Sequence, residues 1–410
     1  MKHNAIVGQS GGPTAAINAT LAGVIAGAIE SNLINTLFGA FNGVEGMLNE
    51  TLVDLTAEFD LEEKLSLLKQ TPAAALGSCR KKLPKVDDKC EQEIYESLFD
   101  LFSRYDIAYF FYIGGNDSMD TVAKLTAYAK AHNKKGVSFI GVPKTIDNDL
   151  DGTSHTPGFG SAAKYIATTV QEILRDTAVY TVKAVTIIEI MGRDAGWLTA
   201  SSALCRRMTD VAPDLVYLPE STFDMEHFFE DIEQAFQKHP NLVVCVSEGV
   251  RFADGRYVGE GSQSGVTDAF GHKYLQGTGK ALELAVKERF GCKVRSVELS
   301  LPQRCAAHIL SENDISESFG VGRAAVSFAS ENTGVMIAYV RHDEPYSITY
   351  EPKDVLKIAN QIRTVPSEFI TERGNNVTDS CLDYLAPLIA GEYPTVYCGG
   401  LPAHYTISKQ

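Results

Sequence analysis

Positive charge is scarce in this sequence. No Lys or Arg occurs between His3 and Glu63, and the whole chain carries a formal net charge of −15. Nucleic acids and anionic membranes are bound through basic surfaces, so this charge balance argues against both as partners. Anionic small molecules are still allowed, because a few cations close to a ligand outweigh a distant negative field.

Long apolar runs are also absent. The apolar stretch Ala19–Ile29 is too short to span a bilayer, and it follows a glycine-rich turn and not a basic leader region. We therefore expect a buried helix there and a cytoplasmic protein. The eight cysteines form no C-x-x-C pair, which favours buried, reduced thiols over disulfides or a metal cluster.

No Pro/Gly/Ser-rich linker marks a domain boundary in the 410 residues, yet this length suggests two domains or one large α/β unit. Five apolar segments are expected to be strands, and each runs directly into a loop of glycine and polar residues: Ala5–Val7, Ile107–Ile113, Val137–Val142, Ala184–Ile190 and Leu242–Val246. A helix is expected over about residues 15–30, and another from the turn at residues 114–118 to about residue 132. This alternation predicts doubly wound α/β structure, with ligands at the carboxyl ends of the strands.

Two glycine pairs follow such strands. Gly11-Gly12 and Gly114-Gly115 leave the backbone bare near a helix start, and Asn116, Asp117 and Ser118 add polar oxygens to the second turn. Backbone N–H groups at a helix N-terminus are a cradle for phosphate. An ordinary turn between strand and helix, capped by Asp117 or Ser118, is the alternative.

The segment from Lys144 to Asp149 carries the densest chemistry. Thr145, Asp147 and Asp149 lie beside Lys144, so two carboxylates crowd one strand end. Such carboxylates raise each other's pKa unless a cation neutralises them. One could act as a general base and another could hold hydrated Mg²⁺, whereas a solvated acidic turn is the alternative.

Further along the chain, single polar residues follow the later strands. Arg193 comes directly after Met191 and Gly192, and its guanidinium suits a phosphate or a sugar hydroxyl, although pairing with Asp194 is open. Glu248 could accept hydrogen bonds from a sugar. Arg80 and Arg304 are further candidate cations, with a solvated basic surface as the alternative.

Together these motifs resemble the phosphofructokinases in order and spacing over roughly residues 5–310. The series is Ser10-Gly11-Gly12, Gly114-Gly115-x-Asp117-Ser118, Thr145-Ile146-Asp147-Asn148-Asp149, Met191-Gly192-Arg193, Glu248-Gly249 and Gln303-Arg304. The resemblance implies two doubly wound, Rossmann-like domains with the active-site cleft between them. It implies fructose 6-phosphate as acceptor and Mg²⁺ as cofactor.

The resemblance also assigns roles. Asp147 matches the general base, and Thr145 matches a neighbour that positions the substrate. The sugar site corresponds to Thr145, Asp147, Met191, Gly192, Arg193, Glu248 and Arg304, and the donor site to Gly11, Gly12, Arg80, Gly115 and Ser118. Asp149 and Asn116 correspond to the metal site, where the family usually has Asp in place of Asn116.

Two positions bear on the phosphoryl donor. Members that use ATP carry glycine at the positions of Asp117 and Lys144, whereas members that use pyrophosphate carry Asp and Lys, as this chain does. A carboxylate at Asp117 repels the α-phosphate of ATP: two like charges ~4 Å apart at an effective dielectric of ~20 repel by about 4 kcal/mol. We therefore expect a reversible, pyrophosphate-dependent enzyme in which Lys144 and Asp117 join Asp147 and Thr145 in catalysis.

The resemblance further divides the chain. Residues 1–155 would bind the donor, with about 311–345 returning to that domain; 156–310 would bind the sugar phosphate; and 346–410 would pack or form an interface. A homodimer or homotetramer is implied, although Ala184 stands where bacterial ATP-dependent members use an Arg that reaches the neighbouring subunit. Leu21 and Ile25 stand near the Arg positions of their effector site, so regulation through that site is not expected.

Two alternatives remain open on the sequence. One is an ATP-dependent phosphofructokinase with an unusual donor pocket. The other is a weakly active regulatory subunit that binds sugar phosphate, which only Asn116 favours. A dinucleotide-binding dehydrogenase is excluded, because G-x-G-x-x-G and its later ribose-binding acid are absent in context.

Overall fold

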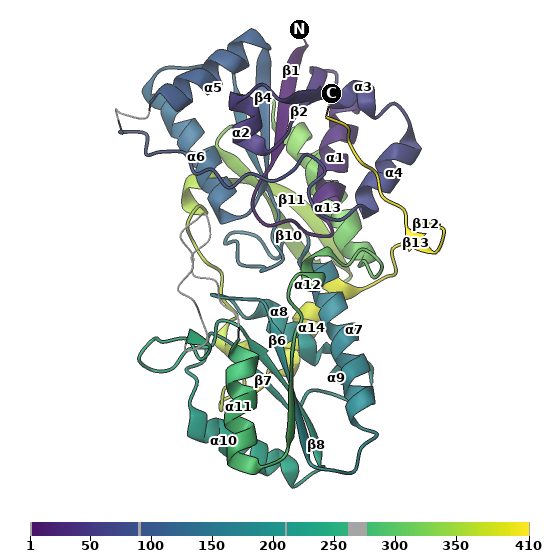
Figure 1. The fold of residues 1–410 in the computed structure, drawn as a ribbon. Coiled ribbons are helices and arrows are strands. Elements are labelled where there is room, and N and C mark those ends of the chain that lie inside the picture. Colours follow the sequence, from purple (N-terminus) through teal and green to yellow (C-terminus); the bar gives the residue numbers. More distant parts are fainter. Residues whose placement is uncertain (1, 89–91, 210, 261–276, 410) are drawn as a thin grey trace.

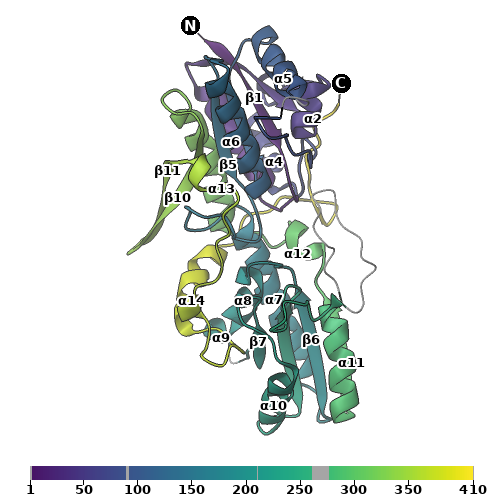
Figure 2. The same cartoon turned by 90° about the vertical axis from the view of Figure 1, so that its left-hand side faces the viewer.

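The computed structural model describes residues 2–88, 92–209, 211–260 and 277–409. The chain forms two α/β halves stacked end to end (Figures 1 and 2). Each half is built on its own sheet, so the expected two-domain α/β class is confirmed.

The first sheet has seven strands in the order β11-β10-β5-β4-β1-β2-β3. Strands β2, β1, β4, β5 and β10 run parallel, and β3 and β11 join the two edges antiparallel. The strands are β1 (His3–Gln9), β2 (Ile34–Ala40), β3 (Leu52–Asp54), β4 (Ile107–Gly114), β5 (Ser138–Pro143), β10 (Val335–Asp343) and β11 (Tyr346–Asp354).

This sheet is covered on both faces, as a parallel sheet must be. Along β1, Ala5 and Val7 pack towards α1 (Ile17–Glu30) and α13 (Glu312–Phe328), whereas Ile6 packs towards the other face with α5 (Glu93–Arg104) and α6 (Asn116–Ala131). Within the described residues, the shorter helices of this half are α2 (Gly43–Leu48), α3 (Leu55–Glu58), α4 (Glu62–Gln70) and the 3₁₀ turn η3 (Val355–Lys357).

The second sheet has four parallel strands in the order β7-β8-β6-β9: β7 (Leu215–Tyr217), β8 (Asn241–Ser247), β6 (Ala184–Ile190) and β9 (Lys293–Glu298). One face packs against α7 (Phe159–Thr177), α8 (Trp197–Ser201) and α14 (Asp379–Leu385), and the other packs against α10 (Met225–Phe236) and α11 (Thr278–Phe290). The remaining short elements are η1 (Ser202–Leu204), α9 (Cys205–Met208), α12 (Pro302–Cys305), η4 (Ser367–Phe369), η5 (Ala386–Ile389), β12 (Tyr397–Cys398) and β13 (Leu401–Pro402).

The chain crosses between the halves more than once. After β9 it returns to the first half, where α13 packs on α1 so closely that a Cβ at Gly23 would lie 2.0 Å from the carbonyl oxygen of Phe319. The return continues through β11 to Asp354, because β11 pairs with β10 along its whole length. It therefore reaches beyond residue 345, and α14 then packs on the second half (Figure 2).

The expectation of buried thiols holds for four cysteines and fails for others. Cys79, Cys205, Cys245 and Cys381 are buried, whereas Cys305 and Cys398 are exposed because they lie on the short α12 and on the small β12–β13 hairpin. Cys90 lies outside the described residues. Among the residues that are described, no helix is long and apolar enough to cross a membrane.

Candidate active site

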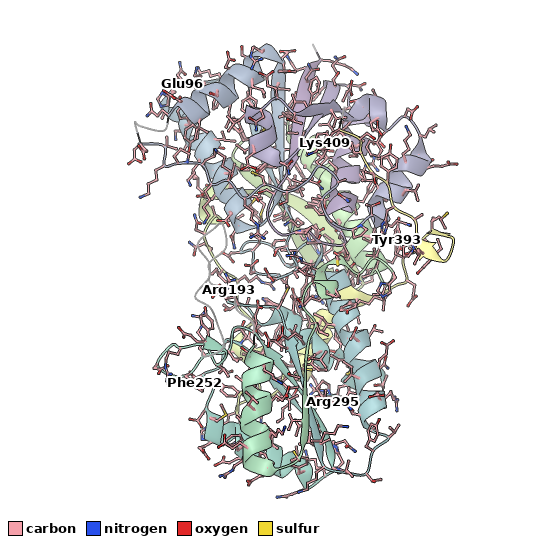
Figure 3. All side chains as sticks on the ribbon, in the orientation of Figure 1. Glu96, Arg193, Phe252, Arg295, Tyr393 and Lys409 are labelled. Carbon is pink, nitrogen blue, oxygen red and sulfur yellow. The ribbon has the colours of Figure 1, made fainter. Side chains whose placement is uncertain are left out.

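The carboxyl ends of β1, β4 and β5 in the first half face those of β6 and β8 in the second. Between them lies a cavity of about 490 Å³. Arg193, labelled in Figure 3, lies at this junction. The predicted site residues that line the cavity are Gly11, Gly12, Arg80, Gly115, Asn116, Asp117, Ser118, Lys144, Thr145, Asp147, Asp149, Met191, Arg193, Glu248 and Arg304.

Gly192 does not line the cavity. Its N–H donates to Glu248 Oε1 at 3.3 Å, and its carbonyl oxygen accepts from the Ser247 hydroxyl. Its backbone has a φ of +134°, which favours glycine. Gly192 therefore shapes the loop that carries Met191 and Arg193, and it holds the Glu248 carboxylate beside them.

Lys144 connects two strand ends across the cavity floor. Its ammonium donates to the carbonyl oxygen of Gly12 at 2.5 Å, and its backbone N–H donates to Gly114 at 3.0 Å. Only 2% of the residue is exposed. Burial lowers the pKa of Lys144 to about 8, an effect that the carboxylate of Asp147 partly opposes. Lys144 is thus a desolvated cation aimed at the glycine turn after β1.

The Asp147 turn is folded by its own side chains. The Thr145 hydroxyl oxygen accepts the Asp147 backbone N–H at 3.1 Å and lies 3.4 Å from a carboxylate oxygen of Asp147. Asn148, which is fully buried, has a φ of 54°. This left-handed residue reverses the chain between the two acids, and Asn tolerates it better than most residues.

Both acids of this turn are held away from their ordinary ionisation. Burial raises the pKa of Asp147, and the ammonium of Lys144 opposes that rise. Burial raises the pKa of Asp149 to about 7, with the neighbouring Asp147 carboxylate adding to it. Two carboxyl groups that resist losing both protons beside a cation are suited to accept a proton near neutral pH.

One end of the cavity is the N-terminus of α6. Its first residues carry no side-chain cap, and the backbone N–H groups of Ser118 and Met119 both donate to the carbonyl oxygen of Gly115, at 2.9 and 3.0 Å. An anion at this end would therefore meet the N–H groups of Asn116 and Asp117. Asp117 points into this region and pairs with Lys82 at 3.0 Å. The N–H of Gly11 donates to Cys79 O at 3.1 Å, so Gly11 contributes close approach of the backbone and not a free donor.

The metal-ligand candidates fit Mg²⁺ in one specific way. The side-chain oxygen of Asn116 is buried and makes no hydrogen bond within the part of the chain that the structure describes. The described residues contain no group of three or more His, Cys, Asp or Glu placed to hold a metal on their own. Mg²⁺ is commonly held by one or two protein oxygens plus substrate phosphates, which matches Asn116 and Asp149 on the cavity wall.

The opposite end of the cavity is lined by polar residues of the second half. Burial raises the pKa of Glu248 to about 8, so it can be a hydrogen-bond donor as well as an acceptor near neutral pH. Gln303 is buried and accepts the Met191 N–H at 3.2 Å, which fixes the Met191 loop. Burial lowers the pKa of Arg304. An anionic group here would meet cations that water screens poorly.

Some lining residues were not predicted. Lys82 and Asp194 stood next to predicted residues, and Asp194 pairs with Arg251 at 2.7 Å and not with Arg193. Asn360 and Ile362 come from the segment after β11 and carry no motif, so only the fold could reveal them. The other unpredicted lining residues are Pro13, Thr14, Ile146 and Ala195.

Comparison with known proteins agrees with this geometry. A sequence model described as phosphofructokinase matches residues 4–327. The pyrophosphate–fructose 6-phosphate 1-phosphotransferase of Halomonas elongata is 39% identical over 415 residues, covering 100% of this chain and 97% of that protein. The protein of the same name from Xanthomonas campestris is 40% identical, with 99% and 96% covered.

A solved structure is similar throughout. The crystal structure of a pyrophosphate-dependent phosphofructokinase from Nitrosospira multiformis has a TM-score of 0.88 and 35% identity, and the match covers 100% of this chain and 97% of that one. Sequence and fold agree over the full length, and the resemblance expected from the motifs is confirmed. The chain belongs to the phosphofructokinase family.

Proposed function

We propose that this protein is a pyrophosphate-dependent 6-phosphofructokinase. It would move a phosphoryl group reversibly from pyrophosphate to the 1-hydroxyl of fructose 6-phosphate, giving fructose 1,6-bisphosphate and phosphate. The observation that carries the proposal is that Asp117, Lys144 and Asp147 share one cavity in a chain similar over its whole length to proteins named for this reaction.

Asp147 is the proposed general base. It takes the proton of the 1-hydroxyl as that oxygen bonds to the terminal phosphorus of pyrophosphate, while the bridging P–O bond breaks and phosphate leaves. Lys144 places a cation beside the groups on which charge develops. Phosphoryl transfer depends mainly on positioning and charge stabilisation, so a buried cation and a buried base meet its needs.

Asn116 and Asp149 are the proposed Mg²⁺ ligands. The structural support is the buried oxygen of Asn116, which makes no hydrogen bond to the described residues. Bound Mg²⁺ would supply charge neutralisation for the phosphate oxygens. The donor would lie at the N-terminus of α6 and the sugar near Met191, Arg193, Glu248 and Arg304. The first half would thus bind the donor and the second half the sugar phosphate.

Three further properties belong to the same proposal. The enzyme would be a cytoplasmic homodimer or homotetramer. It would lack regulation by ADP or phosphoenolpyruvate at the first helix, since Leu21 and Ile25 are fully buried and cannot offer a surface site. Altered activity with millimolar ADP at saturating substrates would contradict this last point.

The test compares donors on two proteins. Initial rates of fructose 1,6-bisphosphate formation are measured with Mg²⁺ and either pyrophosphate or ATP, on wild type and on Asp147→Ala. We expect turnover with pyrophosphate, a loss of at least 10³-fold in kcat in the variant, and little turnover with ATP. Turnover with ATP alone would refute the donor assignment, and no turnover with either would favour a regulatory subunit.

A further inference from the structure

The segment from Asn360 to Val365 runs between the two halves (Figure 1). Its residues Asn360 and Ile362 line the cavity. Ile362 bridges Leu150, and the backbone N–H of Arg363 donates to the carbonyl oxygen of Asp149 at 2.8 Å. The segment is therefore hydrogen-bonded directly to the turn that carries the two acids of the site.

Arg363 also contacts Trp197 in the second half. Its carbonyl oxygen accepts from the indole N–H of Trp197 at 3.1 Å, and its guanidinium lies 4.5 Å above the Trp197 ring. Trp197 is fully buried at the start of α8, immediately after the loop of Met191 and Arg193. Val365 continues the connection, because Glu220 accepts both its N–H at 2.8 Å and that of Gly196 at 2.9 Å.

Tyr384 of α14 adds further hydrogen bonds to Arg363 and to the acid turn. Its hydroxyl accepts from the Arg363 guanidinium at 3.1 Å and from the Asn148 amide at 3.4 Å, and it donates to the carbonyl oxygen of Ser154. The Arg363 guanidinium also reaches the Asn148 carbonyl oxygen at 3.5 Å. The Tyr384 hydroxyl thus connects Asn148, which lies between the two acids, to Ser154 further along the same loop.

We propose that Arg363 and Tyr384 are positioning residues, which fix the Asp147–Asp149 turn against the loop that carries Met191 and Arg193. The inference rests on the proposed function for its kinetic consequence and on the contacts alone for its structural one. A buried turn with a left-handed Asn keeps its geometry only if its neighbours hold it. Misplacing a base by about 1 Å can cost about 10²-fold in rate.

The test uses two conservative variants with matched controls. Tyr384→Phe removes only the hydroxyl, and Arg363→Met removes the guanidinium but keeps the backbone bonds. The controls are Tyr405→Phe, whose hydroxyl bonds Glu58 elsewhere in the C-terminal segment, and Arg206→Met, whose guanidinium bonds the carbonyl oxygen of Val377 at 2.8 Å. Neither control group contacts the acid turn in the bonds that the structure describes.

We expect kcat with pyrophosphate to fall about tenfold in Tyr384→Phe and more in Arg363→Met, with both KM values changing less than threefold and the controls unchanged. Amide hydrogen exchange of residues 145–154 should accelerate in the two variants and not in the controls. A large KM increase at unchanged kcat, or equal losses in the controls, would overturn the inference.

The two proposals can fail separately. Wild-type turnover with pyrophosphate decides the function. Wild-type activity together with unchanged kcat in Tyr384→Phe would overturn the positioning role alone. Without wild-type activity, the exchange measurement decides the role: unchanged exchange of residues 145–154 in Tyr384→Phe would refute it.

Discussion

Lys82 forms an ion pair with Asp117 at 3.0 Å, so the carboxylate that was expected to repel ATP is partly neutralised by its own neighbour. The side chains are 45% and 31% exposed, and such half-exposed pairs contribute at most about 1 kcal/mol. The repulsion of an α-phosphate by Asp117 is therefore weaker than that of an isolated carboxylate. Donor selectivity becomes a property of the pair.

Variants of Asp117 and of Lys82 should change kcat/KM for ATP in opposite directions. Asp117→Gly should raise kcat/KM for ATP at least about tenfold, because it removes the opposing charge, and adding Lys144→Gly should relax donor preference further. Lys82→Met should act in the other direction, since it leaves Asp117 without its cation. The constants kcat and KM are measured with pyrophosphate and with ATP. An unchanged ratio of pyrophosphate to ATP in all three variants would contradict the role of the pair.

The pH dependence of kcat/KM follows from the buried groups of the free enzyme. Burial lowers the pKa of Lys144 to about 8, so activity should decline as pH rises through that value and the cation is lost. Burial raises the pKa of Asp147, so the acid limb should lie above the usual carboxyl range. Lys144→Arg, which keeps its charge, should extend the plateau to about pH 10 at a lower rate. An alkaline limb unmoved in that variant would exclude Lys144.

Asp149, the proposed Mg²⁺ ligand, should lower the free energy of unfolding at neutral pH. Its pKa is raised to about 7 in the folded state, whereas an unfolded Asp titrates near 4. The folded state thus binds the proton more tightly, and stability falls as pH rises from about 4 to 7. At pH 8 and without added metal, the free energy of unfolding of Asp149→Asn should therefore exceed that of wild type by about 1–3 kcal/mol, measured by denaturant titration. At pH 4 the two free energies of unfolding should be nearly equal. A variant less stable than wild type at pH 8 would contradict this.

The repeated pattern of an apolar strand followed by a polar, glycine-containing loop predicted most of the site. The carboxyl ends of parallel strands lie at one edge of a sheet, which places Lys144 with Asp147 and Arg193 with Glu248. The two pairs belong to different sheets, and the expectation that they share the cleft between two domains came from the resemblance to the phosphofructokinases. The helix expected from about residue 15 begins at Ile17, a difference typical of helix ends.

What could not be predicted is long-range and lacks motifs. Asn360, Ile362 and Arg363 lie more than two hundred residues after the Asp147–Asp149 turn, and Ile362 and Arg363 reach the Asp149–Leu150 segment through backbone bonds that any sequence can make. Tyr384 looks like an ordinary packing residue in α14 until its hydroxyl is seen against Asn148. Strand β10 likewise depends on pairing with β5, and the edge strand β11 on pairing with β10, which the local pattern does not specify.

The amide at Asn116 gives the last prediction, on metal affinity. Its side-chain oxygen is buried and makes no hydrogen bond to the residues described, and the residue lines the cavity, which suits a metal ligand. Asn116→Asp adds a charge to the same atom position, so the Mg²⁺ concentration for half-maximal activity should fall about tenfold. Asn116→Ala removes the oxygen and should raise it by a similar factor.

The measurement is a Mg²⁺ titration of the initial rate at fixed free pyrophosphate. Asn241→Ala is a control, because its side-chain oxygen is also buried and without a hydrogen bond to described residues, but it stands at the start of β8, at the opposite end of that strand from the cavity. This oxygen lies outside the cavity, so the variant should leave the half-maximal concentration within about twofold. If Asn116→Asp and Asn116→Ala shift it in the same direction, the residue acts through the fold of the α6 N-terminus and not as a ligand.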